Sequence, residues 1–268
     1  MIARSYLFVP GDRPDRFDKA LAAGADAVIV DLEDAVAPAA KAAARTAVGA
    51  WLTAEKQVLL RINADTTEWF GDDLKLVRAP GIVGILLPKA ERIDGALQAI
   101  CAETGKFLLP QIETARGFEQ ARALASAPGV ERLLFGTLDF QVDMGIDGEG
   151  DELAYFRSAM VLVSRLAGLQ PPVDGPCTSL DDVAQITADT HRARRIGFGG
   201  KLCIHPRQVA PVNAAFAPSA DDLVWAQRVL AAAAESGGAA VALDGRMVDR
   251  PVILKAEQMV REAARRGM

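Results

Sequence analysis

The feature that most constrains the fold of this chain is a regular alternation between short apolar runs and stretches rich in Ala, Arg and Glu. The apolar runs carry many Val, Ile, Leu and Phe residues, which predicts buried strands. The stretches between them have the composition of helices. Eight apolar runs end before residue 205, at residues 6–9, 27–31, 58–62, 83–87, 107–112, 132–135, 172–174 and 202–204.

Eight strands separated by helices predict an α/β fold, a parallel (β/α)8 TIM barrel. An open doubly wound sheet is the structural alternative, although no Gly-x-Gly-x-x-Gly motif follows any strand, which disfavours a dinucleotide-binding fold. We expect the barrel to cover residues 1–217. Residues 218–268 would form a C-terminal helical extension, with a Gly- and Ala-rich hinge or loop at 236–242. This extension either belongs to the same structural domain or packs on a neighbouring subunit.

Bulk properties disfavour several classes of protein. The net charge of −5 and the pI near 5.2 give no general attraction to nucleic acid. No apolar run approaches the roughly 20 residues that span a bilayer. The first residues lead directly into a strand, so neither a membrane segment nor a signal peptide is expected. The three scattered cysteines fit a reducing cytoplasm better than a disulfide framework.

Acidic side chains follow two of the predicted strands. Glu113 comes directly after the strand at 107–112, and Asp139 lies just beyond the strand at 132–135. Barrel active sites form at the carboxyl ends of strands, and paired carboxylates suit a hard divalent cation such as Mg2+. With only two histidines in the chain, a His-rich zinc or iron site is disfavoured. The alternatives are that Glu113 and Asp139 only begin their helices, and that Asp143 replaces Asp139 as a ligand.

Two cationic side chains leave apolar strands at the same end of the predicted barrel. Arg61 ends the third strand and Lys89 follows the fourth. A cation in such surroundings needs an anionic partner, which is either a substrate oxygen or an internal carboxylate. Glu33 and Asp34, directly after the second strand, are the internal candidates.

Three further residues are candidates for binding. Arg16 and Lys19 are three residues apart, so they share one face of the first predicted helix. They either hold phosphates or face solvent. His205 follows the last strand, where it either lines the pocket or orients the chain.

Eight short motifs occur in an order that resembles the citrate lyase β-subunit-like proteins of the HpcH/HpaI aldolase/citrate lyase superfamily. That superfamily includes malyl-CoA lyases and 4-hydroxy-2-oxo-acid aldolases. The resemblance covers nearly the whole chain. The motifs are RSYLFVPG at 4–11, DLEDAV at 31–36, RIN at 61–63, LPK at 87–89, IET at 112–114, FGTLDF at 135–140, IHP at 204–206 and DGRMVD at 244–249.

The resemblance implies a TIM-barrel lyase that is usually a homotrimer or a dimer of trimers. Such an enzyme requires Mg2+, with Mn2+ as an alternative, and cleaves a 3-hydroxyacyl thioester between its second and third carbons. Glu113 and Asp139 would be the metal ligands, and Arg61 would hold the thioester or enolate oxygen. Arg16 and Lys19 would contact the phosphates of coenzyme A.

The remaining roles implied by the resemblance concern carboxylates. Glu33 and Asp34 would be pocket carboxylates beside the metal site. Asp249 would be the acid/base that the C-terminal segment inserts into the site of a neighbouring subunit. The aldolase branch carries a His where this chain has Asp34, so the thioester branch is favoured.

The expected substrates are therefore citryl-, citramalyl- or malyl-CoA-type thioesters, and the expected products are acetyl-CoA and a small 2-oxo acid. Two alternatives stay open. One is the β subunit of a citrate lyase complex, which acts on a citryl-acyl carrier protein. The other is a non-catalytic barrel that only binds acyl-CoA, which the joint presence of Glu113, Asp139, Arg61 and Asp249 disfavours.

Overall fold

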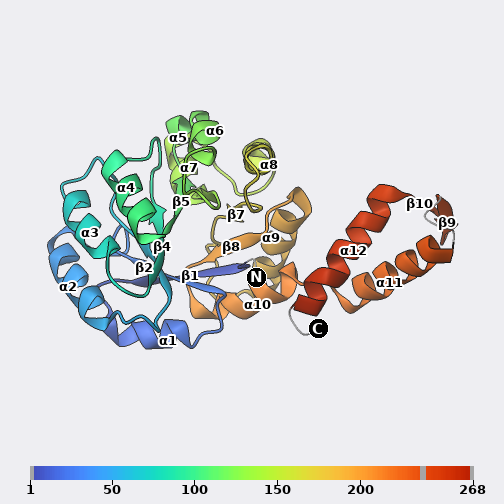
Figure 1. Cartoon of the computed structure of the whole chain (residues 1–268), viewed down its shortest axis with the longest axis horizontal. Coiled ribbons are helices and arrows are strands. Elements are labelled where there is room, and N and C mark those ends of the chain that lie inside the picture. The colour runs from blue at the N-terminus through green and yellow to red at the C-terminus, as the bar shows by residue number, and fades with distance from the viewer. Residues whose placement is uncertain (1–2, 236–239, 266–268) are drawn as a thin grey trace. The chain divides into compact units, whose positions relative to one another are not determined.

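The computed structural model describes residues 3–235 and 240–265, and its contacts divide the chain into two compact units, residues 2–216 and residues 217–268. In the first unit eight parallel strands pair in sequence order, and β8 pairs with β1. This closing pair excludes an open sheet and confirms the TIM barrel (Figure 1). The strands are β1 (Ser5–Pro10), β2 (Ala27–Asp31), β3 (Val58–Arg61), β4 (Ile82–Leu87), β5 (Phe107–Ile112), β6 (Leu134–Phe135), β7 (Val173–Asp174) and β8 (Gly200–Cys203).

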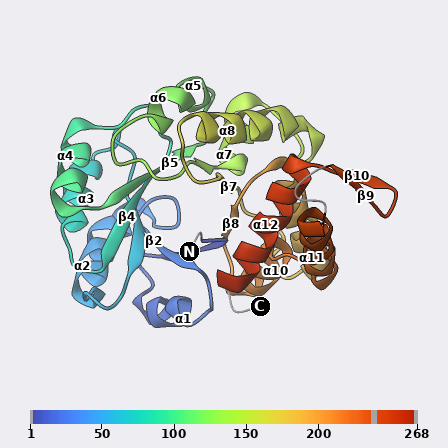
Figure 2. The same ribbon diagram turned by 45° about the vertical axis from the view of Figure 1, so that its right-hand side comes forward.

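Helices cover the outside of this barrel in both views (Figures 1 and 2). Among the described residues, no helix is long and apolar enough to cross a membrane. The helices of the first unit are α1 (Phe17–Leu21), α2 (Lys41–Trp51), α3 (Phe70–Val77), α4 (Gly95–Thr104), α5 (Ala115–Glu119), α6 (Ala121–Ala125), α7 (Thr137–Met144), α8 (Ala154–Leu166), α9 (Val183–Ile196) and α10 (Val209–Phe216). Short 3-10 turns occur at Pro14–Arg16, Pro38–Ala40, Asp151–Leu153 and Pro206–Gln208.

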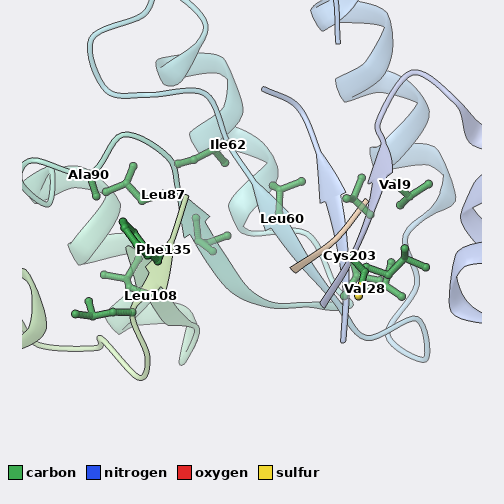
Figure 3. Close-up of a cluster of buried hydrophobic side chains, with 14 of the residues drawn as sticks. Val9, Val28, Leu60, Ile62, Leu87, Ala90, Leu108, Phe135 and Cys203 are labelled. Atoms are coloured by element: carbon green, nitrogen blue, oxygen red, sulfur yellow. The ribbon is translucent and has the colours of Figure 1, made fainter. Parts of the chain in front are cut away.

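Two apolar layers follow from the period-two alternation of side chains along the strands. One layer packs between strands and helices and includes Val28, Leu60, Leu108 and Phe135 (Figure 3). The other fills the inside of the barrel, as in other barrels of this size. Its buried members are Tyr6, Ile29, Leu59, Leu86, Leu109, Leu134, Val173 and Leu202.

The second unit consists of two helices joined through a hairpin, α11 (Ala220–Glu235), β9 (Val241–Leu243), β10 (Arg246–Val248) and α12 (Arg250–Arg265). Asp244 and Gly245 both have positive φ, as the tight turn of a two-residue hairpin requires. The helices lie side by side and share an apolar core that includes Ala226, Val229 and Ala256 (Figure 2). Of the predicted Gly- and Ala-rich loop at 236–242, residues 236–239 lie outside the described residues, and the rest enters β9.

Candidate active site

The candidate site continues the inward-pointing rows of side chains that form the inner apolar layer. On β2, β3 and β5, the next inward positions beyond that layer are occupied by Asp31, Arg61 and Gln111. Because the strands are parallel, these three polar side chains gather at the carboxyl end of the barrel. They line one cavity of about 260 Å³ there. Barrel enzymes place their chemistry at this end.

Arg61 is held by a buried carboxylate on the neighbouring strand. Asp31 and Arg61 are register partners, and the guanidinium meets the carboxylate at two points, Nε to Oδ1 at 2.7 Å and Nη2 to Oδ2 at 2.6 Å. Asp31 also accepts hydrogen bonds from the backbone N–H groups of Glu33 and Ala35. Burial lowers the pKa of Arg61, but Asp31 and Glu33 outweigh it and raise that pKa above its ordinary value. Arg61 is therefore a fixed, permanently charged group whose orientation Asp31 determines.

Glu33 links Arg61 to Lys89. Its carboxylate lies 3.3 Å from Nη1 of Arg61 and pairs closely with Nζ of Lys89, which also lies 3.3 Å from Asp34. Burial raises the pKa of Glu33, against the opposing effect of Arg61 and Lys89. Burial also acts to raise the pKa of Asp34, but Lys89 and Arg61 outweigh it and lower that pKa. Both expected partners of the two strand-end cations are thus present, and Asp31 is a third.

Glu113 is completely buried and is held by two donors. The backbone N–H of Lys89 donates to Oε1 at 2.7 Å, and Nε2 of Gln111 donates to Oε2 at 2.5 Å. The backbone of Lys89 is left-handed at this contact, with a φ of 46°. Burial raises the pKa of Glu113 to about 8, with a further contribution from nearby Asp139. The charged form of this carboxyl group is therefore disfavoured by burial, although nearby Arg61 acts to lower its pKa.

Three observations show that this carboxyl group and Asp139 fit a hard divalent cation. Burial and a neighbouring carboxylate disfavour the ionised form of Glu113, and a cation would reverse that effect. Oε1 of Gln111 is buried and has no hydrogen-bond partner within the described residues. At Gly136, a Cβ atom would lie 2.1 Å from Oε2 of Glu113, so only glycine leaves room for the carboxylate.

The oxygen donors suit Mg2+ better than a soft metal. Protein ligands alone do not complete such a site. Residues 3–235 and 240–265 contain no group of three or more His, Cys, Asp or Glu side chains that could hold a metal ion. Substrate oxygens and water would have to supply the other positions, as is common for Mg2+.

Buried polar groups anchor the loop that carries Glu33 and Asp34. Nζ of Lys41 donates to the carbonyl oxygens of Leu32 and Glu33, both at 2.9 Å. The side chain of Asn63 donates to the same Leu32 carbonyl. Burial lowers the pKa of Lys41 despite the surrounding carboxylates. These contacts fix the backbone from which the pocket carboxylates project.

The other residues predicted to bind a ligand lie in different surroundings. His205 accepts a hydrogen bond on Nδ1 from the N–H of Arg207 and caps a short 3-10 turn. The next residue toward the strand, Ile204, lines the cavity. Arg16, in the 3-10 turn before α1, and Lys19, within α1, are both exposed. Asp143, the rival ligand, accepts from the N–H of Ala115 at 2.6 Å.

Asp249 belongs to the second unit. Its Oδ1 accepts from the N–H of Val252 at 3.4 Å and its carbonyl accepts from the N–H of Ile253, so it lies at the start of α12. The side chain is partly exposed. Its role as an acid/base in a neighbouring subunit stays a prediction.

A search for charged residues that follow the predicted strands does not identify Gln111 and Gly136. Gln111 lies inside an apolar strand, and Gly136 looks like an ordinary turn residue. A usable signal exists for Gln111, because it shares the inward parity of Leu109 and Glu113 on the same strand. For Gly136 the cause is the close approach of Glu113, which only the folded structure reveals.

Comparison with known proteins agrees with this architecture. Residues 4–206 match the family described as HpcH/HpaI aldolase/citrate lyase. A citrate lyase subunit beta-like protein of Mycobacterium tuberculosis is 35% identical over 264 residues, covering 96% of this chain and 94% of the relative. An L-malyl-CoA/beta-methylmalyl-CoA lyase of Cereibacter sphaeroides is 33% identical over 300 residues, covering 97% and 94%.

A solved structure is similar over almost the same length. The crystal structure of protein CitE from Mycobacterium tuberculosis in complex with magnesium, acetoacetate and coenzyme A aligns with a TM-score of 0.86. The two chains are 35% identical, and the alignment covers 98% of each.

Proposed function

The chain belongs to the HpcH/HpaI aldolase/citrate lyase family, and from that premise we propose a magnesium-dependent lyase that cleaves a 3-hydroxyacyl-CoA thioester to acetyl-CoA and a 2-oxo acid. Family membership makes the protein a lyase of carbon–carbon bonds. The observation that carries the finer proposal is the oxygen-only pair of buried Glu113 and half-buried Asp139 beside the fixed guanidinium of Arg61. The magnesium, acetoacetate and coenzyme A in the similar CitE structure support the same assignment.

Glu113 and Asp139 would hold the metal, and Lys89 and Gln111 keep Glu113 in place through their hydrogen bonds. When bound, Mg2+ lowers the pKa of the substrate hydroxyl and polarises the carbonyl that forms from it. We assign acceptance of the hydroxyl proton to Asp34, which lines the cavity and whose lowered pKa keeps it ionised. The bond between the second and third carbons then breaks, and its electron pair forms the acetyl-thioester enolate.

Arg61 would stabilise the enolate oxygen. Its orientation is set before substrate arrives, because Asp31 holds it at two points, and a preorganised charge needs no rearrangement during the reaction. Glu33 limits its movement from the other side. Asp249 would return a proton to the enolate carbon, which gives acetyl-CoA and balances the proton taken up by Asp34.

Asp249 would reach the reaction from a neighbouring subunit of a homotrimer or a dimer of trimers. Arg16 and Lys19 would bind coenzyme A phosphates. Lys89 and His205 would border the substrate, with Lys89 also neutralising Glu33 and Asp34. The protein would work in the cytoplasm, where acyl-CoA is available.

A panel of citryl-, citramalyl- and malyl-CoA tests the proposal. Each thioester is incubated with enzyme in Mg2+ or in EDTA, and acetyl-CoA is measured directly. We expect release from at least one thioester in Mg2+ and none in EDTA. Glu113→Gln and Asp139→Asn should abolish release while circular dichroism stays unchanged. Undiminished activity in EDTA would contradict the metal assignment.

A second arm distinguishes free CoA thioesters from a carrier protein. A citrate lyase β subunit would turn over a citryl-acyl carrier protein and neglect the CoA esters. Binding of acyl-CoA without any release of acetyl-CoA would instead identify a non-catalytic barrel.

A further inference from the structure

The cavity at the mouth of the barrel has two chemically different sides. The charged side comes from the end of β2 and the loop after it, from the end of β3 and from the first turn of α7, with Asp31, Asp34, Arg61 and Asp139. The other side comes from β1, from the segment after β7 and from β8, which are consecutive in the closed sheet. This apolar wall consists of Pro10, Pro176, Leu202 and Ile204, and the ring of Phe8 connects it to the charged side, because its centroid lies 4.5 Å from the guanidinium of Arg61.

The cations at the cavity already have carboxylate partners. Within the part of the chain that the structure describes, Arg61 is the cation among the lining residues, and Asp31 and Glu33 both pair with it. Nearby Lys89 pairs with Glu33 and Asp34. A divalent cation would be neutralised by its own two carboxylate ligands. One substrate carboxylate can join that cation, but a second carboxylate would find no unpaired cation among the described lining residues.

We propose that the 2-oxo acid half of the substrate carries a single carboxylate and a small apolar substituent, so that the products are acetyl-CoA and pyruvate rather than oxaloacetate. This inference rests on the lyase function proposed above. The apolar wall receives the substituent on the carbinol carbon. In citramalyl-CoA that substituent is a methyl group, in malyl-CoA a hydrogen atom, and in citryl-CoA a carboxymethyl group.

The expected order of substrates follows from what each substituent does at the wall. A methyl group buries apolar surface there, and its loss in malyl-CoA should lower kcat/KM by roughly tenfold. A carboxymethyl group would lose hydration without a partner, close to Asp31 and Asp139. Since an unpaired, desolvated charge costs several kcal/mol, kcat/KM for citryl-CoA should fall by at least about 100-fold relative to citramalyl-CoA.

Charge-adding variants at the rim of the wall give the decisive test. Leu138 and Ile204 both line the cavity, and with 37% and 42% exposure they tolerate a longer side chain. Leu138→Arg or Ile204→Arg would provide the missing counter-charge. Each should raise the ratio of citryl-CoA to citramalyl-CoA turnover by about tenfold or more.

Matched controls separate charge from size and from position. Leu138→Gln changes shape and polarity without adding charge, so the ratio should rise much less. Val142→Arg adds the same charge one turn further along α7, at a residue that is 84% exposed and does not line the cavity. It should leave the ratio unchanged. Calorimetric titration of wild type with pyruvate and with oxaloacetate should show tighter binding of pyruvate, a result independent of turnover.

The outcomes separate this inference from the proposed function. Release of acetyl-CoA from citramalyl-CoA above malyl-CoA and citryl-CoA, with the ratio shifted only by the two rim arginines, supports the inference. Equal or preferred turnover of citryl-CoA by wild type, or the same ratio in Leu138→Arg and Val142→Arg, would overturn it and leave the lyase function intact. Release from none of the three thioesters would overturn the lyase function itself.

Discussion

At the scale of single residues, Glu113 connects the chemistry of the site to the stability of the fold. Its folded-state pKa of about 8 lies above the ordinary value of 4.5, because burial disfavours the charge. Ionisation therefore favours the unfolded chain. The stability that protonated Glu113 contributes is complete below about pH 4.5 and is lost as the pH rises through 8.

The corresponding prediction compares wild type with Glu113→Gln in EDTA. Between pH 4.5 and 8 the free energy of unfolding of wild type should fall relative to the variant by on the order of 4 kcal/mol. In Glu113→Gln, the oxygen of the new side-chain amide can accept from the N–H of Lys89. Its NH2 group can donate to Oε1 of Gln111, which has no partner among the described residues of the wild-type protein, once the Gln111 amide is flipped. Urea unfolding at several pH values measures the difference.

Two controls accompany this measurement. Saturating Mg2+ should flatten the pH dependence of wild type, because a bound cation favours the ionised carboxylate. Glu119→Gln removes an exposed carboxylate and should leave the slope in place. Parallel curves for wild type and Glu113→Gln in EDTA would contradict the raised pKa.

Arg61 gives the second prediction at this scale. Arg61→Lys keeps a positive charge but loses the two-point contact with Asp31. We expect kcat to fall at least about tenfold, which corresponds to roughly 1.4 kcal/mol of lost transition-state stabilisation. Steady-state kinetics measure it. Arg92→Lys, in an exposed pair with Asp65, is the matched control and should be neutral. An unchanged kcat would leave Arg61 with a structural role only.

The main ion-pair partner of Arg61 was not predictable from the sequence. The need for an anion was predictable from a cation in an apolar strand, and Glu33 does contact it. The main partner is Asp31, because the pairing of β2 with β3 places these two residues side by side. Register between strands depends on packing of the whole sheet, and a single sequence does not contain it.

At the scale of elements, the turn from β6 to α7 is the most demanding connection of the site. Gly136 lies between the strand and the helix that carries Asp139, and Glu113 packs against it. Gly136→Ala should displace the Glu113 carboxylate, since an added Cβ would lie 2.1 Å from Oε2. We expect Mg2+ affinity and kcat/KM each to fall by about tenfold or more, with the fold retained.

Calorimetry with Mg2+ and circular dichroism measure these effects of Gly136→Ala. Gly71→Ala is the control, because a Cβ at that helical position meets nothing within 4 Å. It should stabilise α3 slightly and leave metal affinity unchanged. Wild-type affinity in Gly136→Ala would mean that the carboxylate position is not critical.

Physical properties of the segments explain which helices and strands were predictable from the sequence. The eight strands were predictable because they are apolar, short and regularly spaced. A helix beginning near Asp139 was predicted only as an alternative to the metal role, because Thr, Asp and Val are poor helix formers, and α7 is that helix. Phe140 holds it in place instead, through ring contacts with Phe135 at 5.1 Å and Phe156 at 4.8 Å. The hairpin of β9 and β10 was also missed, although Asp244-Gly245 carries the signal of a tight turn.

At the scale of the whole molecule, the proposed chemistry needs groups from both compact units. The carboxylates and Arg61 lie in residues 2–216, and Asp249 lies in residues 217–268. A single sequence predicts both groups of residues, but it does not contain the information that decides which barrel Asp249 serves. We predict that Asp249 serves the barrel of a neighbouring subunit.

Mixing two inactive variants tests this arrangement. Asp249→Ala and Glu113→Gln should each be inactive alone. If Asp249 acts in a neighbouring subunit, mixed oligomers contain some sites in which both groups are wild type, and part of the activity should return. Subunit exchange is verified by mass spectrometry of isotopically labelled chains. Complete exchange without recovery would place Asp249 in its own chain's site or outside the chemistry.

The left-handed backbone at Lys89 has a consequence for how this site can change over evolutionary time. The contact with Glu113 uses the main-chain N–H, which every amino acid except proline supplies, whereas the contacts with Glu33 and Asp34 use the ammonium group. Glycine would even relieve the backbone. Mutational drift at position 89 can therefore erase one function of the residue and spare the other. A lineage could change the electrostatics of its pocket there without first losing the position of the carboxylate that is proposed to bind the metal.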